Sequence, residues 1–202
     1  MSPMLRLVVY LVIAFVSGSV PYGFLIAKLK GVDITAVGSG NIGATNTARV
    51  LGSKVGGIVL LLDAVKAFVP TWLALRSQVE LPSLSLSGLA VGIVGLAAIC
   101  GHVFSPWMRF KGGKGVAPSL GVFLVLAPLA TSTAAFVWVL LFVSFRIASV
   151  ASLVASLVLV IAMVWLGAPS GYLAVVIATF GLVVMRHTDN IKRLLAKREG
   201  KL

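Results

Sequence analysis

Charged residues are scarce in this chain, and acidic residues are the scarcest of them. Only 11% of the 202 residues are charged, whereas 59% are hydrophobic, and the mean hydropathy is +1.11. A water-soluble domain carries about a quarter charged residues, so this composition excludes one and indicates a polytopic membrane protein. The single cysteine, Cys100, excludes a disulfide framework and a cysteine-based metal cluster. We expect neither a metal nor any other cofactor.

The charges that are present are mostly basic. Lys and Arg number 17 against five Asp and Glu, which gives a net charge of +12. In a soluble protein this excess would indicate nucleic-acid binding. In a membrane protein it is explained first by cytoplasmic loops that face anionic lipid, and second by an anionic substrate. We therefore expect membrane lipids, and no nucleic acid, among the partners.

Uncharged stretches predict the membrane spans. As one helix, residues 115–145 would be about 46 Å long, which exceeds a hydrocarbon core of about 30 Å, and Pro128 lies near their middle. Residues 147–185 are interrupted by the turn-forming segment 167–171. The sequence predicts an all-α integral membrane protein with a single domain, residues 1–202, and seven transmembrane helices. These lie at 7–27, 55–75, 87–105, 115–127, 129–145 and in the two halves of 147–185, with polar loops at 28–54, 76–86 and 106–114.

The distribution of basic residues predicts the orientation. With seven spans and the N-terminus outside, eight basic residues fall in cytoplasmic loops and six in a cytoplasmic C-terminal tail. Only Arg6 and Arg76 fall outside, and Lys66 lies within a span. If residues 115–145 formed one span, this bias would nearly vanish. The positive-inside rule therefore favours seven spans, with the C-terminus in the cytoplasm.

This topology gathers the polar clusters on one face of the membrane. Their glycine-rich turns expose backbone N–H groups that can surround phosphate oxygens, and neighbouring Lys and Arg supply the countercharge. Only Asp33, Asp189 and Glu199 are acidic on this face. The pattern predicts an anion site at the cytoplasmic surface of the membrane. Its candidate segments are 38–49, 101–115, 146–152 and 186–190.

Two familiar phosphate-binding motifs do not fit their context. Residues 38–43 read G-S-G-N-I-G, and Asp63 follows twenty residues later, as in a dinucleotide fingerprint. However, a membrane span precedes them in place of a buried β-strand. The run F-K-G-G-K-G is not a P-loop, because Gly115 stands where Ser or Thr is required. Asp63 and Lys66 lie three residues apart within one span, and we interpret them as a structural ion pair before a functional one.

Three polar segments resemble the signature motifs of one family. They read G-S-G-N-I-G-A-T-N-T-A-R at 38–49, G-H-V-F-S-P-W-M-R-F-K-G-G-K-G-V-A at 101–117 and R-H-T-D-N-I-K-R-L at 186–194. In this order and spacing they are similar to the motifs of the bacterial acyl-phosphate:glycerol-3-phosphate acyltransferases. The resemblance extends over almost the whole chain, including its length and the seven-span plan. Residues 146–152 resemble a fourth polar patch of the family.

The resemblance implies a reaction. An acyl group would pass from acyl phosphate to the 1-hydroxyl of glycerol 3-phosphate, giving lysophosphatidic acid and inorganic phosphate, the first step of phospholipid synthesis. Family members take neither acyl-CoA nor acyl carrier protein as direct donor, and they lack the H-x-x-x-x-D motif of other acyltransferases. This sequence agrees, because Trp107 stands five residues after His102 and Lys192 stands five after His187. The implied location is the bacterial inner membrane, with the active site on its cytoplasmic side.

The resemblance also implies the residues of two anion pockets. Arg49 and Lys114 would neutralise the phosphate of glycerol 3-phosphate, while Ser39, His187 and Asn190 orient its hydroxyls. These five residues are the catalytic candidates, and Ser152 completes their pocket. The head of the acyl phosphate would be held by Thr45, Asn46, Gly112, Gly113 and Gly115.

The sequence leaves some alternatives open. The hydroxyl proton would pass either to His187, whose ordinary pKa is near neutral, or to a substrate phosphate. A transporter of an organic phosphate is the competing class of function, but it predicts polar groups along a path through the bilayer and an internal repeat. A purely structural membrane protein would leave the glycine, serine and asparagine motifs unexplained. Acyl-chain preference and oligomeric state are not predicted.

Overall fold

Every regular element in the described residues, 1–80 and 86–202 of this computed structural model, is a helix. The all-helical prediction is therefore confirmed for that part of the chain, and the predicted loop at 76–86 lies partly outside it. The elements are α1 (Pro3–Ser19), α2 (Tyr22–Leu29), α3 (Ala44–Leu51), α4 (Ser53–Arg76), α5 (Leu89–Val103), the 3₁₀ turn η1 (Pro106–Met108), α6 (Val116–Leu126), α7 (Pro128–Phe145), α8 (Ala148–Trp165), α9 (Ser170–Arg186) and α10 (Thr188–Leu195).

Five helical segments in the described residues are long and apolar enough to cross a membrane. They are α4, α7, α8, and the joined segments Pro3–Leu29 and Leu89–Met108. The pair α9 and α10, bent by 57°, gives a sixth. Helix α6 has 11 residues and is about 16 Å long, roughly half of a hydrocarbon core. Each predicted span thus has an apolar helix and the chain is a multi-pass membrane protein, but the count of seven crossings stays a prediction.

Proline and glycine set the ends of these helices. The predicted span 7–27 is interrupted, because Pro21 has no N–H to donate and disfavours a helical conformation at Val20. The break predicted at Pro128 is confirmed, with Pro128 as the first residue of α7. The loop predicted at 28–54 was too long: it contains α3, and α4 begins at Ser53, directly after Gly52 with a φ of +91°.

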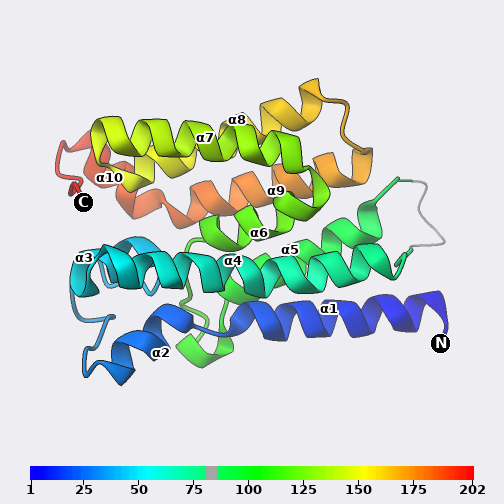
Figure 1. Ribbon diagram of the computed structural model, residues 1–202, viewed down its shortest axis with the longest axis horizontal. Coiled ribbons are helices and arrows are strands. Elements are labelled where there is room, and N and C mark those ends of the chain that lie inside the picture. The colour runs from blue at the N-terminus through cyan, green and yellow to red at the C-terminus, as the bar shows by residue number, and fades with distance from the viewer. Residues whose placement is uncertain (81–85) are drawn as a thin grey trace.

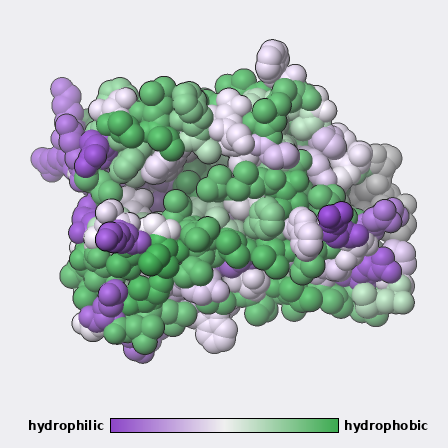
Figure 2. All heavy atoms as spheres, viewed as in Figure 1, coloured by the Kyte–Doolittle hydropathy of each residue, from purple (hydrophilic) through white to green (hydrophobic). Residues whose placement is uncertain are grey.

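The long helices lie roughly along one common direction (Figure 1). Helices α1, α4 and α5 form one group and α7, α8 and α9 a second, and α6 packs between α4 and α7. The chain termini lie at opposite ends of the long axis, and α2, α3 and α10 gather at the C-terminal end. We call this the basic end, because its loops and helices hold 14 of the 17 basic residues. Hydrophobic side chains cover the surface between the two ends in Figure 2.

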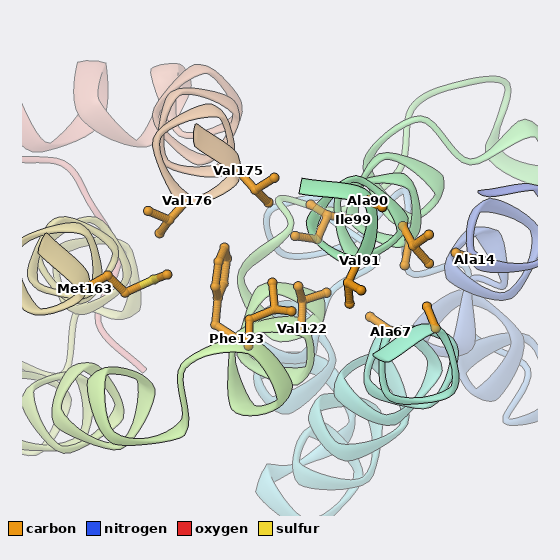
Figure 3. Packing of buried hydrophobic residues seen from close by; sticks show 14 of the residues in the cluster. Ala14, Ala67, Ala90, Val91, Ile99, Val122, Phe123, Met163, Val175 and Val176 are labelled. Atoms are coloured by element: carbon orange, nitrogen blue, oxygen red, sulfur yellow. The ribbon is translucent and has the colours of Figure 1, made fainter. Parts of the chain in front are cut away.

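The core is built around α6. Phe123 and Val122 of this helix are fully buried, and Figure 3 shows them between Val176 of α9 and Ile99 of α5. The outward faces carry large exposed apolar side chains, as a surface in contact with lipid requires. The short helix α6 therefore joins the two groups of long helices.

Gly121 lets α6 approach α4 closely. A Cβ at this position would lie 2.0 Å from the carbonyl oxygen of Ala64. We expect Gly121→Ala to force the two helices apart and to cost about 1–3 kcal/mol, seen as a lower melting temperature in detergent. Gly57→Ala is the matched control, because Gly57 lies on α4 with nothing within 4 Å, and alanine raises helix propensity. Equal melting temperatures for both variants would contradict this packing.

Candidate functional site

A cavity of about 600 Å³ opens at the basic end and continues between the helices. Its wall is polar near the loops and apolar deeper inside, where α6, α7, α8 and α9 supply most of the side chains. Nine of the eleven residues that the sequence nominated line this cavity: Ser39, Thr45, Asn46, Arg49, Lys114, Gly115, Ser152, His187 and Asn190. Segments more than a hundred residues apart in the chain therefore meet at one place.

Several helices begin at the polar part of the wall. The first turns of α3, α6 and α8 contribute Ala44, Val116 and Ala148 to the lining, and Asn190 in the first turn of α10 does the same. The first N–H groups of a helix have no partner within it, and its N-terminus carries a partial positive charge. Their convergence makes the polar part of the cavity suited to an anion.

The loop before α3 is held by one side chain. Asn46 is 1% exposed, and its Oδ1 accepts from the Ser39 N–H at 2.8 Å while its Nδ2 donates to the carbonyls of Ile34 and Val37. Gly38, at a φ of +63°, must lack a side chain because a Cβ there would meet Asn46 Oδ1. The amide of Asn46 is thus used within the protein, where it places Ser39 at the cavity.

A hydrogen-bond chain joins the loop after η1 to the C-terminal segment. Lys114 Nζ donates to Asn190 Oδ1, and Asn190 Nδ2 donates to Glu199 Oε1. The same carboxylate accepts from Ser149 Oγ at 2.8 Å and from Arg193 Nε at 2.7 Å. Burial raises the pKa of Glu199, but these hydrogen bonds outweigh it and hold the pKa below its ordinary value. Glu199 is therefore ionised, fixes Asn190 and pairs with Arg193 of the C-terminal segment.

Charges on the cavity wall do not cancel. Among the described lining residues, Arg193 pairs with Glu199, and Asp63 pairs with Lys66 just behind the wall. Arg49 and Lys114 have no acidic partner within 4 Å. Burial, together with the neighbouring arginines, lowers the pKa of Lys114 to about 8. An anion bound beside it would relieve this repulsion.

His187 ends α9 and lies at the start of α10. Its Nδ1 lies 2.8 Å from the Val183 carbonyl oxygen, which can only accept, so Nδ1 carries the proton. Burial and the nearby Lys114 lower its pKa to about 4, so the ring is neutral at neutral pH. Nε2 then keeps its lone pair. His187 is in the tautomer that can accept a proton at the cavity.

Gly112 and Gly113, unlike Gly115, do not line the cavity. Their N–H groups donate to the carbonyls of Val103 and His102, and their own carbonyls accept from Arg186. The expectation that these N–H groups face a ligand is not met in this conformation. The two glycines fix the path of the loop that carries Lys114, and a Cβ at Gly113 would collide with the His102 ring.

The ion pair expected for Asp63 and Lys66 is present, with 2.7 Å between Oδ1 and Nζ. Both side chains are at most 3% exposed, and Lys66 also donates to the Val20 carbonyl, which the break before α2 leaves available. His102 joins the pair, with Nδ1 3.7 Å from the same Asp63 oxygen. His102 is the last but one residue of α5. Its contact with Asp63 was not predicted.

The chain matches the family model described as glycerol-3-phosphate acyltransferase over residues 8–197. The glycerol-3-phosphate acyltransferase of Myxococcus xanthus is 40% identical, over 94% of this chain and 96% of that protein. The enzyme of Aquifex aeolicus is 38% identical over the same shares of each chain. The chain belongs to the glycerol-3-phosphate acyltransferase family.

Solved structures of this family agree with the fold. A crystal structure of PlsY (YgiH), an integral membrane glycerol 3-phosphate acyltransferase in its glycerol 3-phosphate form, is 37% identical with a TM-score of 0.91. The match covers 98% of this chain and 96% of the PlsY chain. The lysophosphatidic acid form of PlsY gives 36% identity and a TM-score of 0.88. The resemblance seen in the three polar motifs of the glycerol-3-phosphate acyltransferases is confirmed.

Some lining residues of this family member had not been nominated. Arg193 and Ser149 lie in or next to segments that the sequence had singled out, so their positions gave a usable signal. Trp138 and Thr179 also line the cavity, but they lie inside uncharged spans and no sequence pattern distinguishes them. For these two residues only the packing of α7, α8 and α9 reveals the position.

Proposed function

We propose that this protein transfers an acyl group from acyl phosphate to the 1-hydroxyl of glycerol 3-phosphate, giving lysophosphatidic acid and inorganic phosphate. The observation that carries the proposal is the amphipathic cavity. One part of it holds two cations without acidic partners and several helix N-termini, and the rest is mostly apolar. Such a site fits substrates that carry phosphate, one of which also carries a long apolar chain.

Family membership supports the same reaction. PlsY structures include a glycerol 3-phosphate form and a lysophosphatidic acid form, which are one substrate and the product of the proposed transfer. Arg49 and Lys114 would neutralise the phosphate of glycerol 3-phosphate, with Ser39, Ser152, His187 and Asn190 around it. Thr45, Gly115 and the first turns of α3 and α6 would face the acyl-phosphate head, with Asn46, Gly112 and Gly113 fixing the loops behind them.

The chemistry needs no covalent intermediate. Acyl phosphate is a mixed anhydride with phosphate as its leaving group, so positioning and charge stabilisation are sufficient. The hydroxyl oxygen of glycerol 3-phosphate forms the new ester bond as the bond from the acyl carbon to the phosphate oxygen breaks. The hydroxyl proton passes to Nε2 of His187 or to a phosphate oxygen of a substrate. No metal or cofactor enters this scheme.

The proposed placement in the cell follows the charge distribution. We propose seven crossings, the N-terminus outside and the basic end facing the cytoplasm at the bacterial inner membrane. Both water-soluble glycerol 3-phosphate and the polar head of acyl phosphate would then enter from the cytoplasmic side. The lysophosphatidic acid product would leave sideways into lipid, because the apolar part of the cavity lies between membrane helices.

Purified protein in detergent tests the donor directly. Glycerol 3-phosphate is supplied with palmitoyl phosphate in one reaction and palmitoyl-CoA in another, and lysophosphatidic acid is measured. We expect product from palmitoyl phosphate alone. Product from palmitoyl-CoA alone would overturn the donor, and no product from either would favour transport of an organic phosphate.

His187→Ala is expected to lower kcat at least tenfold, which corresponds to about 1.4 kcal/mol. A general base contributes about a hundredfold or more, so a loss above that size assigns the proton to His187, and a loss near tenfold assigns it to a substrate phosphate. His187→Gln is the companion variant, since it keeps a hydrogen-bonding group without a basic nitrogen. Near-normal turnover of both variants would remove His187 from the site.

Binding of glycerol 3-phosphate should weaken above about pH 8. Lys114 has a pKa of about 8 in the ligand-free protein, so its charge is lost as the pH rises through that value. A phosphate monoester is already dianionic there, because its second pKa is about 6. Isothermal titration calorimetry from pH 6.5 to 9.5 should show Kd rising up to tenfold per unit above pH 8. A Kd that stays constant to pH 9.5 would contradict this role of Lys114.

A further inference from the structure

Trp138 of α7 contacts a nominated substrate-binding residue of α8. Its indole Nε1–H donates to Ser152 Oγ at 3.0 Å, and both residues line the cavity. The indole ring also stacks on Phe142, with centroids 4.9 Å apart and planes at 19°. The ring is therefore held from one side by its own helix, and its N–H is directed to the neighbouring helix.

An indole N–H can donate but not accept. Ser152 Oγ must then be the acceptor, and its own proton remains available for another partner. Ser152 is only 7% exposed, so water reaches it poorly except through the cavity. Among the described residues no acceptor for this proton is found within the protein.

Many other helical hydroxyls behave differently. A serine or threonine within a helix commonly donates to a carbonyl three or four residues earlier. Nine such hydroxyls in the described residues do so: Ser19, Thr47, Thr71, Ser119, Thr131, Thr133, Ser144, Ser156 and Thr188. Ser156 lies one turn beyond Ser152 on the same helix, so the helix itself does not prevent this bond. Ser152 Oγ instead accepts from an indole N–H of the neighbouring helix.

We propose that Trp138 is a positioning residue for glycerol 3-phosphate binding. By occupying a lone pair of Ser152 Oγ, it keeps this hydroxyl out of the hydrogen bonds of its own helix and aimed at a phosphate oxygen of the ligand. This inference rests on the proposed function, which places Ser152 in the glycerol 3-phosphate pocket. Ala134, Ala135 and Val139, on α7 beside Trp138, line the apolar part of the wall, so the indole marks where the polar part begins.

Trp138→Phe tests the N–H separately from the ring. Phenylalanine keeps an aromatic ring on Phe142 and on the apolar wall but has no donor. We expect KM for glycerol 3-phosphate to rise three- to tenfold, with KM for palmitoyl phosphate changed less than twofold. Ser152→Ala should raise the same constant at least as much. The double variant should be no worse than Ser152→Ala, because the two residues act through one hydroxyl.

A matched control and a spectroscopic readout distinguish the positioning role of Trp138 from a purely structural one. Trp165→Phe makes the same substitution at a residue that is 85% exposed and not on the cavity wall, and its kinetics should equal those of the native protein. The chain has four tryptophans, so ¹⁵N-labelled protein gives four indole N–H signals, and Trp138→Phe identifies one of them. Ser152→Ala should move that signal upfield, and glycerol 3-phosphate should move it in native protein.

The outcomes separate this inference from the proposed function. Two results would overturn the positioning role and leave acyl transfer standing. One is an indole signal that does not move in Ser152→Ala, and the other is a double variant in which the effects of the two single variants multiply. If Trp138→Phe does not fold, the change of the indole signals between native protein and Ser152→Ala decides the question. Absence of acyl transfer in native protein, with the indole signal still responding to glycerol 3-phosphate, would overturn the reaction and support the positioning role.

Discussion

Replacing Lys114 with alanine should lower kcat/KM for glycerol 3-phosphate at least a hundredfold, which corresponds to about 2.7 kcal/mol. Lys114 is one of two cations on the cavity wall without an acidic partner, and it also donates to Asn190. Its removal takes away a charge that faces the substrate phosphate in a partly buried place, where truncating one member of a charged pair costs about 2–5 kcal/mol. The measurement is steady-state kinetics with glycerol 3-phosphate varied at saturating palmitoyl phosphate.

Two further variants locate the origin of this loss. Arg49→Ala removes the other unpaired cation, and we expect at least a tenfold fall in turnover. Lys111→Ala is the matched control, because Lys111 is exposed on the same loop and does not line the cavity, so its kinetics should stay within twofold of native. If Lys114→Ala and Lys111→Ala behave alike, the basic charge of the loop serves membrane orientation and the anion site has to be sought elsewhere.

Asp63→Ala should destabilise the fold more than Gly121→Ala does. It leaves Lys66, whose side chain is 2% exposed, without its carboxylate in the middle of α4. Breaking a buried ion pair by removing one partner costs about 3–5 kcal/mol, because the remaining charge is left unpaired. For a chain of this size that corresponds to a melting temperature lower by on the order of 10 °C, measured by thermal unfolding in detergent.

The double variant Asp63→Leu/Lys66→Met discriminates between causes. Replacing both partners by apolar residues of similar volume is often close to neutral, so most of the lost stability should return. Glu80→Ala is the control for an acidic residue, since Glu80 is exposed and should leave the melting temperature unchanged. An Asp63→Ala protein as stable as the Glu80→Ala protein would show that the pair contributes little. A double variant as unstable as Asp63→Ala would assign the loss to the contact with His102 instead.

The fold class could be predicted because it depends on composition within short windows. An apolar run of about twenty residues must satisfy its backbone internally, so each run becomes a helix wherever it packs. Pro128 and the turn before Ser170 end helices for equally local reasons. The break after Ser19 was missed although Pro21 is visible in the sequence, because membrane helices tolerate proline when neighbouring groups satisfy the freed carbonyl. Here Lys66, 46 residues away, binds the carbonyl of Val20.

The candidate site, like the fold, could be predicted from the sequence only in part. The resemblance of three motifs to the family nominated Arg49, Lys114 and His187, whose charge and hydrogen-bonding capacity belong to the side chain itself. Which backbone donors remain available could not be read from those motifs. The N–H groups of Gly112 and Gly113 donate to carbonyls of α5. Gly115, in contrast, precedes a helix whose first N–H groups stay unpaired.

The sequence by itself determined that this is a helical membrane protein with a basic end and an excess of groups that bind anions. Scarce charge and the position of each Lys and Arg are properties of the chain that folding does not change. Only the tertiary structure decided which of these groups meet. Glu199, which follows α10, fixes Asn190 and Ser149, and Trp138 of α7 directs Ser152 of α8. These contacts depend on how the helices are placed relative to one another, through packing such as that of Gly121 against Ala64. The hydroxyls, amides and charges were present in the sequence, but their directions come from the packed helices.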